Sequence, residues 1–260
     1  MKKIIICMLI GMFGFVAFSG AEEVKWEEER ATHFIIYYKD APKDFVKEVE
    51  RSAEDYFDEI TRNLGFTRYG GWSFDRRAKI YIYSDKEDYV ASSRQAGWSS
   101  GAVNVKDKII RTFPAAHGFF DTTLPHELGH IIFREFVGFH TPLPLWLDEG
   151  VAMFQEKAQR WGAHKEVKKV IKNGRFKSLT ELSQLRLGRN SSTELVSLFY
   201  SEAASIVSYM VKELGEYRFV SFCRRLKEGK TFEQALRSAY SRFSTIKDLN
   251  KSWVDFLKRQ

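Results

Sequence analysis

Cysteine and proline are scarce in this chain, and each scarcity excludes a class of protein. The 260 residues contain two cysteines, Cys7 and Cys223, too few for a disulfide-stapled scaffold or for a zinc site built from thiolates. Five prolines and 17 glycines exclude a fibrous chain, and 44% hydrophobic with 15% aromatic residues excludes a disordered one. The chain is long enough for a substantial core, and any metal in it must be bound by histidines and carboxylates.

The first 21 residues have the three-part pattern of a secretory signal peptide. Lys2 and Lys3 precede an apolar run over 4–18, and residues 19–21 (Ser-Gly-Ala) supply the small side chains of a cleavage site. The run is shorter than the roughly 20 residues that a spanning helix needs, which favours cleavage over a permanent membrane anchor. We therefore expect residues 1–21 to be removed and the protein to be extracytoplasmic, periplasmic or secreted, with no stable membrane span.

Removal of this segment would change the charge and the thiol chemistry. The formal charge of +7 falls to +5 because two lysines leave, and Cys223 becomes the only cysteine. The mature protein could then form no internal disulfide, so its stability must come from its core or from a bound ion.

The hydrophobic period changes from two to 3.6 residues near Phe119. The earlier part predicts strands over 32–38 and 78–83, a helix over 43–64 and a hairpin of 102–105 with 108–113. The later part predicts only helices, over 122–137, 145–160, 163–173, 193–214, 216–228, 231–240 and 245–258. This order predicts an α+β fold with a mixed N-terminal sheet, one helix packed on that sheet and a mainly helical C-terminal half. We expect one domain over 22–260, with a sheet-containing lobe over 22–118 and a helical lobe over 119–260.

The segment His126-Glu127-Leu128-Gly129-His130 has the HExxH pattern and lies in the first of the later helices. Residues four apart on a helix lie about 40° apart around its axis, so both imidazoles project from one face and can share a zinc ion. Glu127 lies about 100° around the axis from His126, too far to bind the same ion comfortably. It can reach a water molecule next to the ion, which is where a general base is needed.

A catalytic zinc site needs three protein ligands and one open position, and Glu149 is the candidate for the third. Gly138, Pro142 and Pro144 end the HExxH helix, and a new helix opens at Leu145, so the connector can fold Glu149 back toward the histidines. Apolar neighbours make an unpaired carboxylate costly there, and zinc would remove that cost. The alternative is that His126, His130 and Glu149 form a buried polar cluster without a metal.

The spacing of HExxH, 18 residues and then the glutamate of a Trp-Leu-x-Glu-Gly-x-Ala phrase resembles the gluzincin metallopeptidases. The sequence is most similar to the aminopeptidase-N-like and thermolysin-like catalytic cores and to the small peptidase MA-like domains. The resemblance implies a gluzincin-type fold with an active-site helix, one Zn2+ bound by His126, His130 and Glu149, and Glu127 as the base. It also implies an oxyanion-stabilising tyrosine in a phrase like the one that starts at Tyr200; the alternative for Tyr200 is packing in the helix core.

Two departures from the gluzincin pattern affect the predicted activity. Aminopeptidases of this type bind the free amine of the substrate through an acidic residue on a strand, and the corresponding segment here, Gly101-Ala102-Val103-Asn104-Val105, contains no acid. Thermolysin-like enzymes have an aspartate four residues after the third ligand, where this chain has Met153; Asp148 or Asp121 are the candidates to support the histidines instead.

The sequence therefore predicts an exported zinc metallopeptidase that hydrolyses peptide bonds through zinc-activated water, as an endopeptidase rather than an aminopeptidase. Its expected partner is a peptide or protein substrate. No basic and aromatic pattern indicates a nucleic-acid partner, and the sequence does not predict the oligomeric state. The alternative function is a metallopeptidase-like binding or assembly module of the cell envelope with little or no catalysis. The presence of Glu127 favours the enzyme, because a binding module needs no base.

Overall fold

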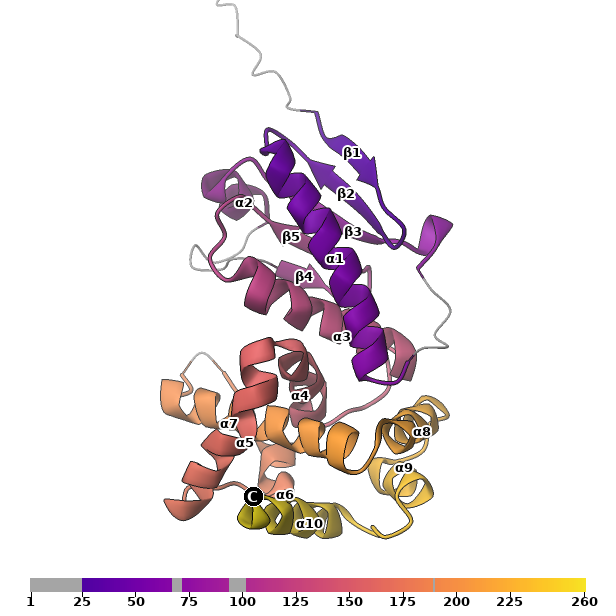
Figure 1. The fold of residues 1–260 in the computed structure, drawn as a ribbon, viewed down its shortest axis with the longest axis vertical. Helices are drawn as coiled ribbons and strands as arrows, with labels where there is room; N and C mark the ends of the chain where they lie inside the picture. The colour runs from indigo at the N-terminus through magenta and orange to yellow at the C-terminus, as the bar shows by residue number, and fades with distance from the viewer. Residues whose placement is uncertain (1–24, 67–71, 94–101, 189) are drawn as a thin grey trace, which may run out of the picture.

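Five strands of the first part of the chain form one mixed sheet (Figure 1). The structure is a computed structural model that describes residues 25–66, 72–93, 102–188 and 190–260, so the expected signal peptide over 1–21 lies outside the described residues. The strand order is β1-β2-β3-β5-β4; the three central strands are parallel, and both edge strands pair antiparallel. The strands are β1 Glu27–Arg30, β2 Phe34–Tyr38, β3 Ala78–Ile82, β4 Ala102–Asn104 and β5 Ile109–Thr112.

The central strands bury alternate side chains on one face of the sheet. On β2 and β3 the residues Phe34, Ile36, Ala78, Ile80 and Ile82 are fully buried, while the residues between them stay partly exposed. This period-two pattern is what a sheet with one covered face requires. Helix α1 (Lys43–Asn63) supplies the cover and crosses the sheet in Figure 1.

Helices follow the sheet. α4 lies between α3 and α7, and all three helices contribute fully buried side chains to the core. None of the helices in the described parts of the chain is both long enough and apolar enough to cross a membrane. The helices besides α1 are α2 Lys86–Ser93, α3 Leu124–Val137, α4 Leu145–Gln155, α5 Lys157–Lys172, α6 Leu179–Gln184, α7 Thr193–Ser208, α8 Glu216–Lys227, α9 Phe232–Ala239 and α10 Ile246–Arg259.

The α+β class and the hairpin of β4 with β5 are confirmed, but β1, α2 and α6 were not predicted. β1 consists of three glutamates and an arginine, a composition that an edge strand tolerates but that carries no hydrophobic alternation. α2 has almost no amphipathic pattern. α6 did have a detectable signal, because Ser178 and Glu181 form a capping box at its start.

The predicted helices 145–160 and 163–173 are wrong at their boundary. α4 ends at Gln155 and α5 begins at Lys157, so the break falls at Glu156, whose backbone is extended (φ −71°, ψ 119°). The sequence has no glycine or proline at this point, so nothing local marks the break. The break depends on contacts with residues distant in the sequence, and Glu156 belongs to the candidate site.

Candidate metal centre and active site

α3 carries His126 and His130 on the face that meets α4, and a glycine allows the two helices to pack closely. A Cβ atom on Gly129 would lie 3.0 Å from the Cα atom of Ala152 and 3.0 Å from the Cγ atom of Gln155. A side chain at this position would require the neighbouring atoms of α4 to move. Glycine at this position of the HExxH segment therefore sets the distance between the histidines and α4.

A second glycine sets the distance between α4 and α7. A Cβ atom on Gly150 would lie 2.4 Å from the carbonyl oxygen of Ala203 and 2.8 Å from a methyl group of Val207, both on α7. Glu149, the residue before this glycine, is thereby held near α3 on one side and near α7 on the other. Two adjacent residues thus have complementary roles. Glu149 is a possible metal ligand, and Gly150 allows the close contact between α4 and α7 that positions it.

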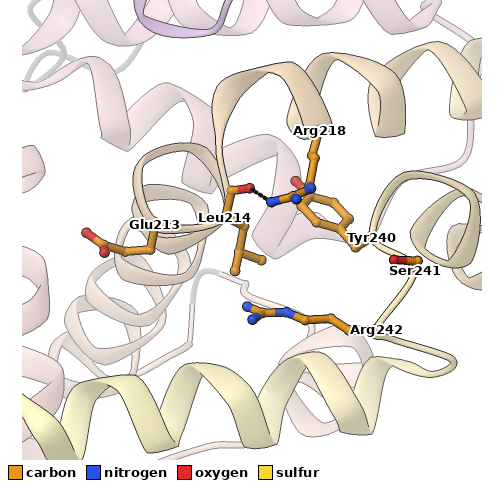
Figure 2. Close-up of a pocket in the computed structure, with 6 residues that line it drawn as sticks. All are labelled: Glu213, Leu214, Arg218, Tyr240, Ser241 and Arg242. Atoms are coloured by element: carbon orange, nitrogen blue, oxygen red, sulfur yellow. Dashed lines mark hydrogen bonds between the residues drawn. The ribbon is translucent and has the colours of Figure 1, made fainter.

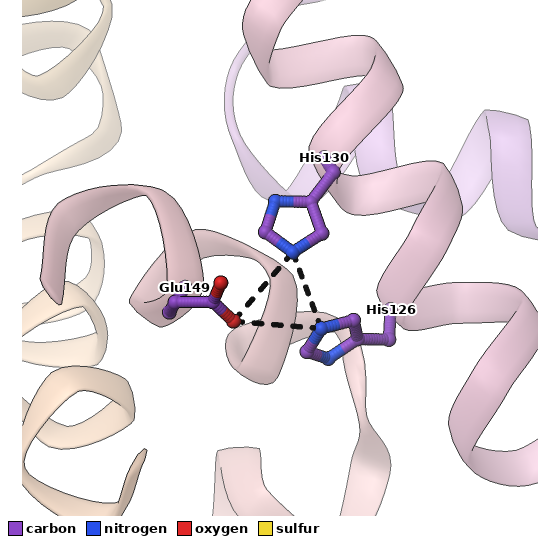
Figure 3. A group of neighbouring side chains, drawn as sticks. All are labelled: His126, His130 and Glu149. Atoms are coloured by element: carbon purple, nitrogen blue, oxygen red, sulfur yellow. Dashed lines mark hydrogen bonds and ion pairs between the residues drawn. The ribbon is translucent and has the colours of Figure 1, made fainter. Parts of the chain in front are cut away.

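The three expected ligands come together in space (Figure 3). The two Nε2 atoms of His126 and His130 are 3.2 Å apart, and each lies 3.7 Å from Oε2 of Glu149. Ligand atoms about 2.0–2.2 Å from a tetrahedral zinc ion are separated from each other by about 3.3–3.6 Å. The three side chains are 11–20% exposed, so they are mostly buried but still reach the surface.

A carboxylate lies behind each of the two histidines, and the Nε2 lone pairs of the two rings face each other. Nδ1 of His126 lies 2.8 Å from Oε1 of Glu156, and Nδ1 of His130 lies 3.5 Å from Oδ1 of Asp148. In the tautomer with the proton on Nδ1, next to these carboxylates, both Nε2 lone pairs and the Glu149 carboxylate face the same point. Such neighbours repel one another unless a cation lies between them, and two imidazoles with one carboxylate are a donor set that suits zinc.

The electrostatics of His130 also indicate a site that favours a cation. Burial disfavours its charged form, but hydrogen bonds to Asp148 and Glu149 and the charges of these carboxylates raise its pKa to about 10. The carboxylates around the two histidines thus favour a positive charge at this position, whether a proton or a metal ion supplies it.

Glu156 is a site residue that sequence reasoning missed. It is 7% exposed and lies seven residues after Glu149, at the break between α4 and α5. In an uninterrupted helix it would lie about two turns after Glu149 and about 20° around the axis, on the face that meets α3 and His126. The hydrogen bond between them fixes the orientation of that imidazole, as the carboxylates behind metal-binding histidines commonly do.

Arg160 holds the break that positions Glu156. Its guanidinium donates to the carbonyl oxygens of Phe154 (2.8 Å) and Gln155 (3.1 Å), which are freed at the end of α4. The same group donates to Oε1 of Glu59 on α1 at 2.8 Å. Burial opposes ionisation of Glu59, but the hydrogen bond and charge of Arg160 hold its pKa below its ordinary value. The geometry at Glu156 therefore depends on a contact between helices 101 residues apart in sequence.

Of the two aspartates proposed as supports, Asp148 contacts a histidine. Asp121 forms no hydrogen bond or ion pair with either histidine in the described structure. Arg134 donates to Oδ2 of Asp148 at 2.7 and 3.0 Å and to the carbonyl oxygen of Thr141 at 3.0 Å. This arginine therefore joins α3, the connector and α4, and it folds the second helix back toward the first.

Glu127 and Tyr200 lie in the electrostatic field of this group. Burial raises the pKa of Glu127, and Glu149 and Glu156 raise it further, while the two histidines partly offset the shift. Burial, followed by the charges of Glu149 and Glu127, raises the pKa of Tyr200 to about 12. Both groups therefore lie near the candidate ligands. The carboxyl group of Glu127 can carry a proton, and the phenol of Tyr200 stays protonated at neutral pH.

A family model described as the peptidase MA superfamily matches residues 65–259, which include α3, α4 and α7 with all five predicted site residues. The chain belongs to the peptidase MA superfamily. No curated protein matches the sequence. Membership confirms the resemblance to gluzincins that the sequence motifs indicated, and it indicates a metallopeptidase that acts on peptide substrates.

A separate pocket of this peptidase MA chain lies among its C-terminal elements (Figure 2). Its two arginines already have structural partners: Arg218 donates to the carbonyl oxygen of Leu214 at 2.8 Å, and Arg242 donates to the hydroxyl of Tyr209 at 3.2 Å. None of the site residues lines this pocket. It is lined by Glu213, Leu214, Arg218, Tyr240, Ser241 and Arg242.

Proposed function

We propose that the protein is an exported, zinc-dependent endopeptidase. The observation that carries the proposal is the convergence of two imidazole nitrogens and one carboxylate oxygen within 4.8 Å of one another, beside the partly buried acid Glu127. His126, His130 and Glu149 would hold one Zn2+ ion. When bound, zinc supplies Lewis-acid chemistry, lowering the pKa of water and polarising a carbonyl oxygen.

Glu127 would move the proton in this reaction. Its carboxylate can accept a proton from the attacking water and later deliver it to the amine nitrogen of the leaving peptide. The partial burial of Glu127 favours a carboxyl group that takes up and releases a proton without a large cost in either direction.

Tyr200 would stabilise the negative charge that develops on the carbonyl oxygen. With a pKa of about 12 its phenol keeps its proton at neutral pH, so it can donate a hydrogen bond as the carbonyl becomes tetrahedral. It extends from α7, which Gly150 allows to lie close to α4. This role goes beyond packing in a helix core, although Tyr200 also contacts the small cluster of Met153, Ala163 and Ala204.

Cleavage inside a chain is supported by strand β4. β4 is the edge of the sheet and, in Figure 1, the strand nearest to the helical half. An exposed edge can pair with an extended peptide through main-chain hydrogen bonds. The segment 101–105 offers no carboxylate to bind a free amino terminus, and the described part of this segment begins at Ala102. Export rests on the signal-peptide pattern of residues 1–21.

The test compares the zinc-loaded protein with Glu127→Gln and Tyr200→Phe on a peptide library, with cleavage sites identified by mass spectrometry. We expect internal cleavage by the wild type, a loss of about 10²–10⁴-fold for Glu127→Gln, and a loss of about 10²–10³-fold in kcat for Tyr200→Phe. Glu233→Gln, an exposed change on α9, is the matched control and should retain full activity.

Three results would contradict the proposal. Equal cleavage by the wild type and Glu127→Gln would remove the base from the mechanism. If the zinc-loaded protein cleaves nothing while both variants fold normally, a binding or assembly module becomes the better account. Removal of only the N-terminal residue from each peptide would make it an aminopeptidase instead.

A further inference from the structure

The face of the sheet opposite α1 carries an ordered pattern of polar, aromatic and charged side chains. Because the strand register is known, the side chains that stand next to each other on this face can be read directly. Two neighbouring rows cross the four strands β1, β2, β3 and β5. The central row is Glu28, Tyr37, Tyr81 and Arg111, and the flanking row is Arg30, Ile35, Lys79 and Ile109.

The central row is built from residue types that are common in protein interfaces. The rings of Tyr37 and Tyr81 stack with centroids 4.9 Å apart, and Trp26 meets Tyr81 edge-on at 5.2 Å. The guanidinium of Arg111 lies 5.8 Å from the centre of the Tyr81 ring. Tyr, Trp and Arg dominate the binding energy of interfaces, because they combine a large apolar surface with a polar end.

Two cations on this face lack an acidic partner. Within the described residues, the side chains of Lys79 and Arg111 form no ion pair and no hydrogen bond, whereas Arg30 pairs with Glu28. Lys79, Arg111 and the two tyrosines are only partly exposed. The face thus offers unpaired positive charge within an apolar and aromatic surface, which fits a partner that brings carboxylates to it.

A second copy of this chain brings a carboxylate to the required position. Consider two sheets packed face to face, with a two-fold axis between them that runs parallel to the strands and midway between β2 and β3. This axis exchanges β1 with β5 and β2 with β3. Glu28 of each copy then faces the partner's Arg111, and Tyr37 faces the partner's Tyr81.

The flanking row is also compatible with this axis. Arg30 falls opposite the partner's Ile109, and Lys79 falls opposite the partner's Ile35, so neither cation of this row faces another cation. Their aliphatic stems can cover the isoleucines while the charged ends reach water. Both copies keep the same strand direction, which is the aligned arrangement of packed sheets.

We propose that this open face is a self-association surface, through which two copies dimerise sheet to sheet about that axis. The surface lies on the sheet, and the catalytic groups lie on α3, α4 and α7, so the proposal does not depend on the proposed peptidase function. The self-complementary order of acid, aromatic, aromatic and cation in the central row is the observation that carries it.

The experiment is a charge swap followed by sedimentation equilibrium over a wide range of protein concentration. The wild type should approach twice the monomer mass as its concentration rises. Glu28→Arg places two arginines opposite each other, and Arg111→Glu places two glutamates opposite each other, so each should weaken dimerisation about tenfold or more. An equimolar mixture of the two variants restores both opposite-charge pairs and should dimerise as the wild type does.

Controls distinguish a loss of dimerisation from a loss of folding. Lys251→Glu, an exposed charge change on α10, should dimerise like the wild type, and thermal melts should show that all variants are folded. A double variant, Glu28→Cys with Arg111→Cys, tests the geometry without relying on charge. Because packed sheets lie about 10 Å apart, beyond the reach of a direct disulfide, the thiols are joined with a bifunctional thiol reagent about 8 Å long. The two thiols of one chain are three strands apart, about 14 Å, so a crosslinked product that runs as a dimer needs a second copy.

A wild type that stays monomeric at every concentration would overturn the proposal, and would leave a foreign acidic protein as the better occupant of the face. A dimer that persists in both single variants would overturn it as well, because the contact would then lie elsewhere on the molecule. Failure of the mixed variants to dimerise, with both folded, would exclude the proposed axis.

Discussion

Replacement of Glu202 by glutamine should change how the stability of the protein depends on pH. Glu202 lies on α7 and is fully buried. Its Oε1 atom accepts a hydrogen bond from the backbone N–H of Lys177 at 2.8 Å, and its Oε2 atom has no hydrogen-bond partner among the described residues. Burial therefore raises its pKa from an ordinary 4.5 to about 8, although Lys177 partly opposes the shift.

The sign of this pH dependence follows from the number of protons that the folded and the unfolded chain bind. Below pH 4.5 the carboxyl group is protonated in both the folded and the unfolded chain, so its contribution to stability is complete. Between about pH 4.5 and 8 the unfolded chain releases this proton while the folded chain retains it. The free energy of unfolding then falls by about 1.4 kcal/mol per pH unit from this group alone. At pH 7 the accumulated loss is about 3 kcal/mol.

Glutamine stays neutral over this range and keeps a carbonyl oxygen for the N–H of Lys177. Urea unfolding of the wild type and Glu202→Gln should therefore diverge by about 3 kcal/mol in free energy between pH 5 and pH 7.5, with the variant gaining relative stability as the pH rises. The control is Glu194→Gln on the same helix, whose side chain is 71% exposed and which should follow the wild-type profile. Both measurements are made at one fixed zinc concentration, so that metal binding contributes equally.

The reasoning about Glu202 fails if the two pH profiles run parallel. A parallel profile would mean that Glu202 is ionised in the folded protein, and that its second oxygen has a partner strong enough to compensate for burial. A constant offset between the curves would not rescue the argument, because an amide changes packing and hydrogen bonding equally at every pH.

Two further predictions concern the candidate site. Glu156→Gln should weaken zinc binding by about 10–100-fold in a chelator competition, because an amide cannot accept the Nδ1–H of His126 as strongly as a carboxylate does; an unchanged affinity would show that this hydrogen bond does not orient the imidazole. Gly150→Ala should lower the free energy of unfolding by about 1–3 kcal/mol in urea titrations, because the new methyl group would meet the backbone of Ala203 at 2.4 Å. A stability equal to that of the wild type would mean that α4 and α7 can separate at little cost.

Much of the candidate site could be predicted from the sequence because its chemistry depends on local spacing. Two histidines four residues apart on one helix share a face in any fold, and the stop signals at Gly138 and Pro142 indicated that the next helix returns. The structure brings His126, His130 and Glu149 together as this reasoning required. The change of hydrophobic period near Phe119 likewise separates the sheet from the helices, because helices and strands bury side chains with different repeats.

The supporting residues of the site depend on contacts between distant segments. Glu156 contacts His126 at the point where α4 breaks without a glycine or proline, and Arg160 joins that break to Glu59 on α1. A helical pattern read along the sequence continues through this point, so the sequence placed Glu156 inside a helix. Hydrogen bonds across 101 residues leave no periodic signal in the chain.

What the sequence alone determined is the set of reactive groups and the secondary structure that carries most of them. Local spacing and hydrophobic periodicity express those properties directly. Only the tertiary structure decided which carboxylates stand behind the histidines and how closely α4 approaches α3 and α7. It also decided the register that aligns Glu28 with Arg111 across the sheet. These properties follow from packing between segments far apart in the chain, where distance and orientation depend on the whole fold.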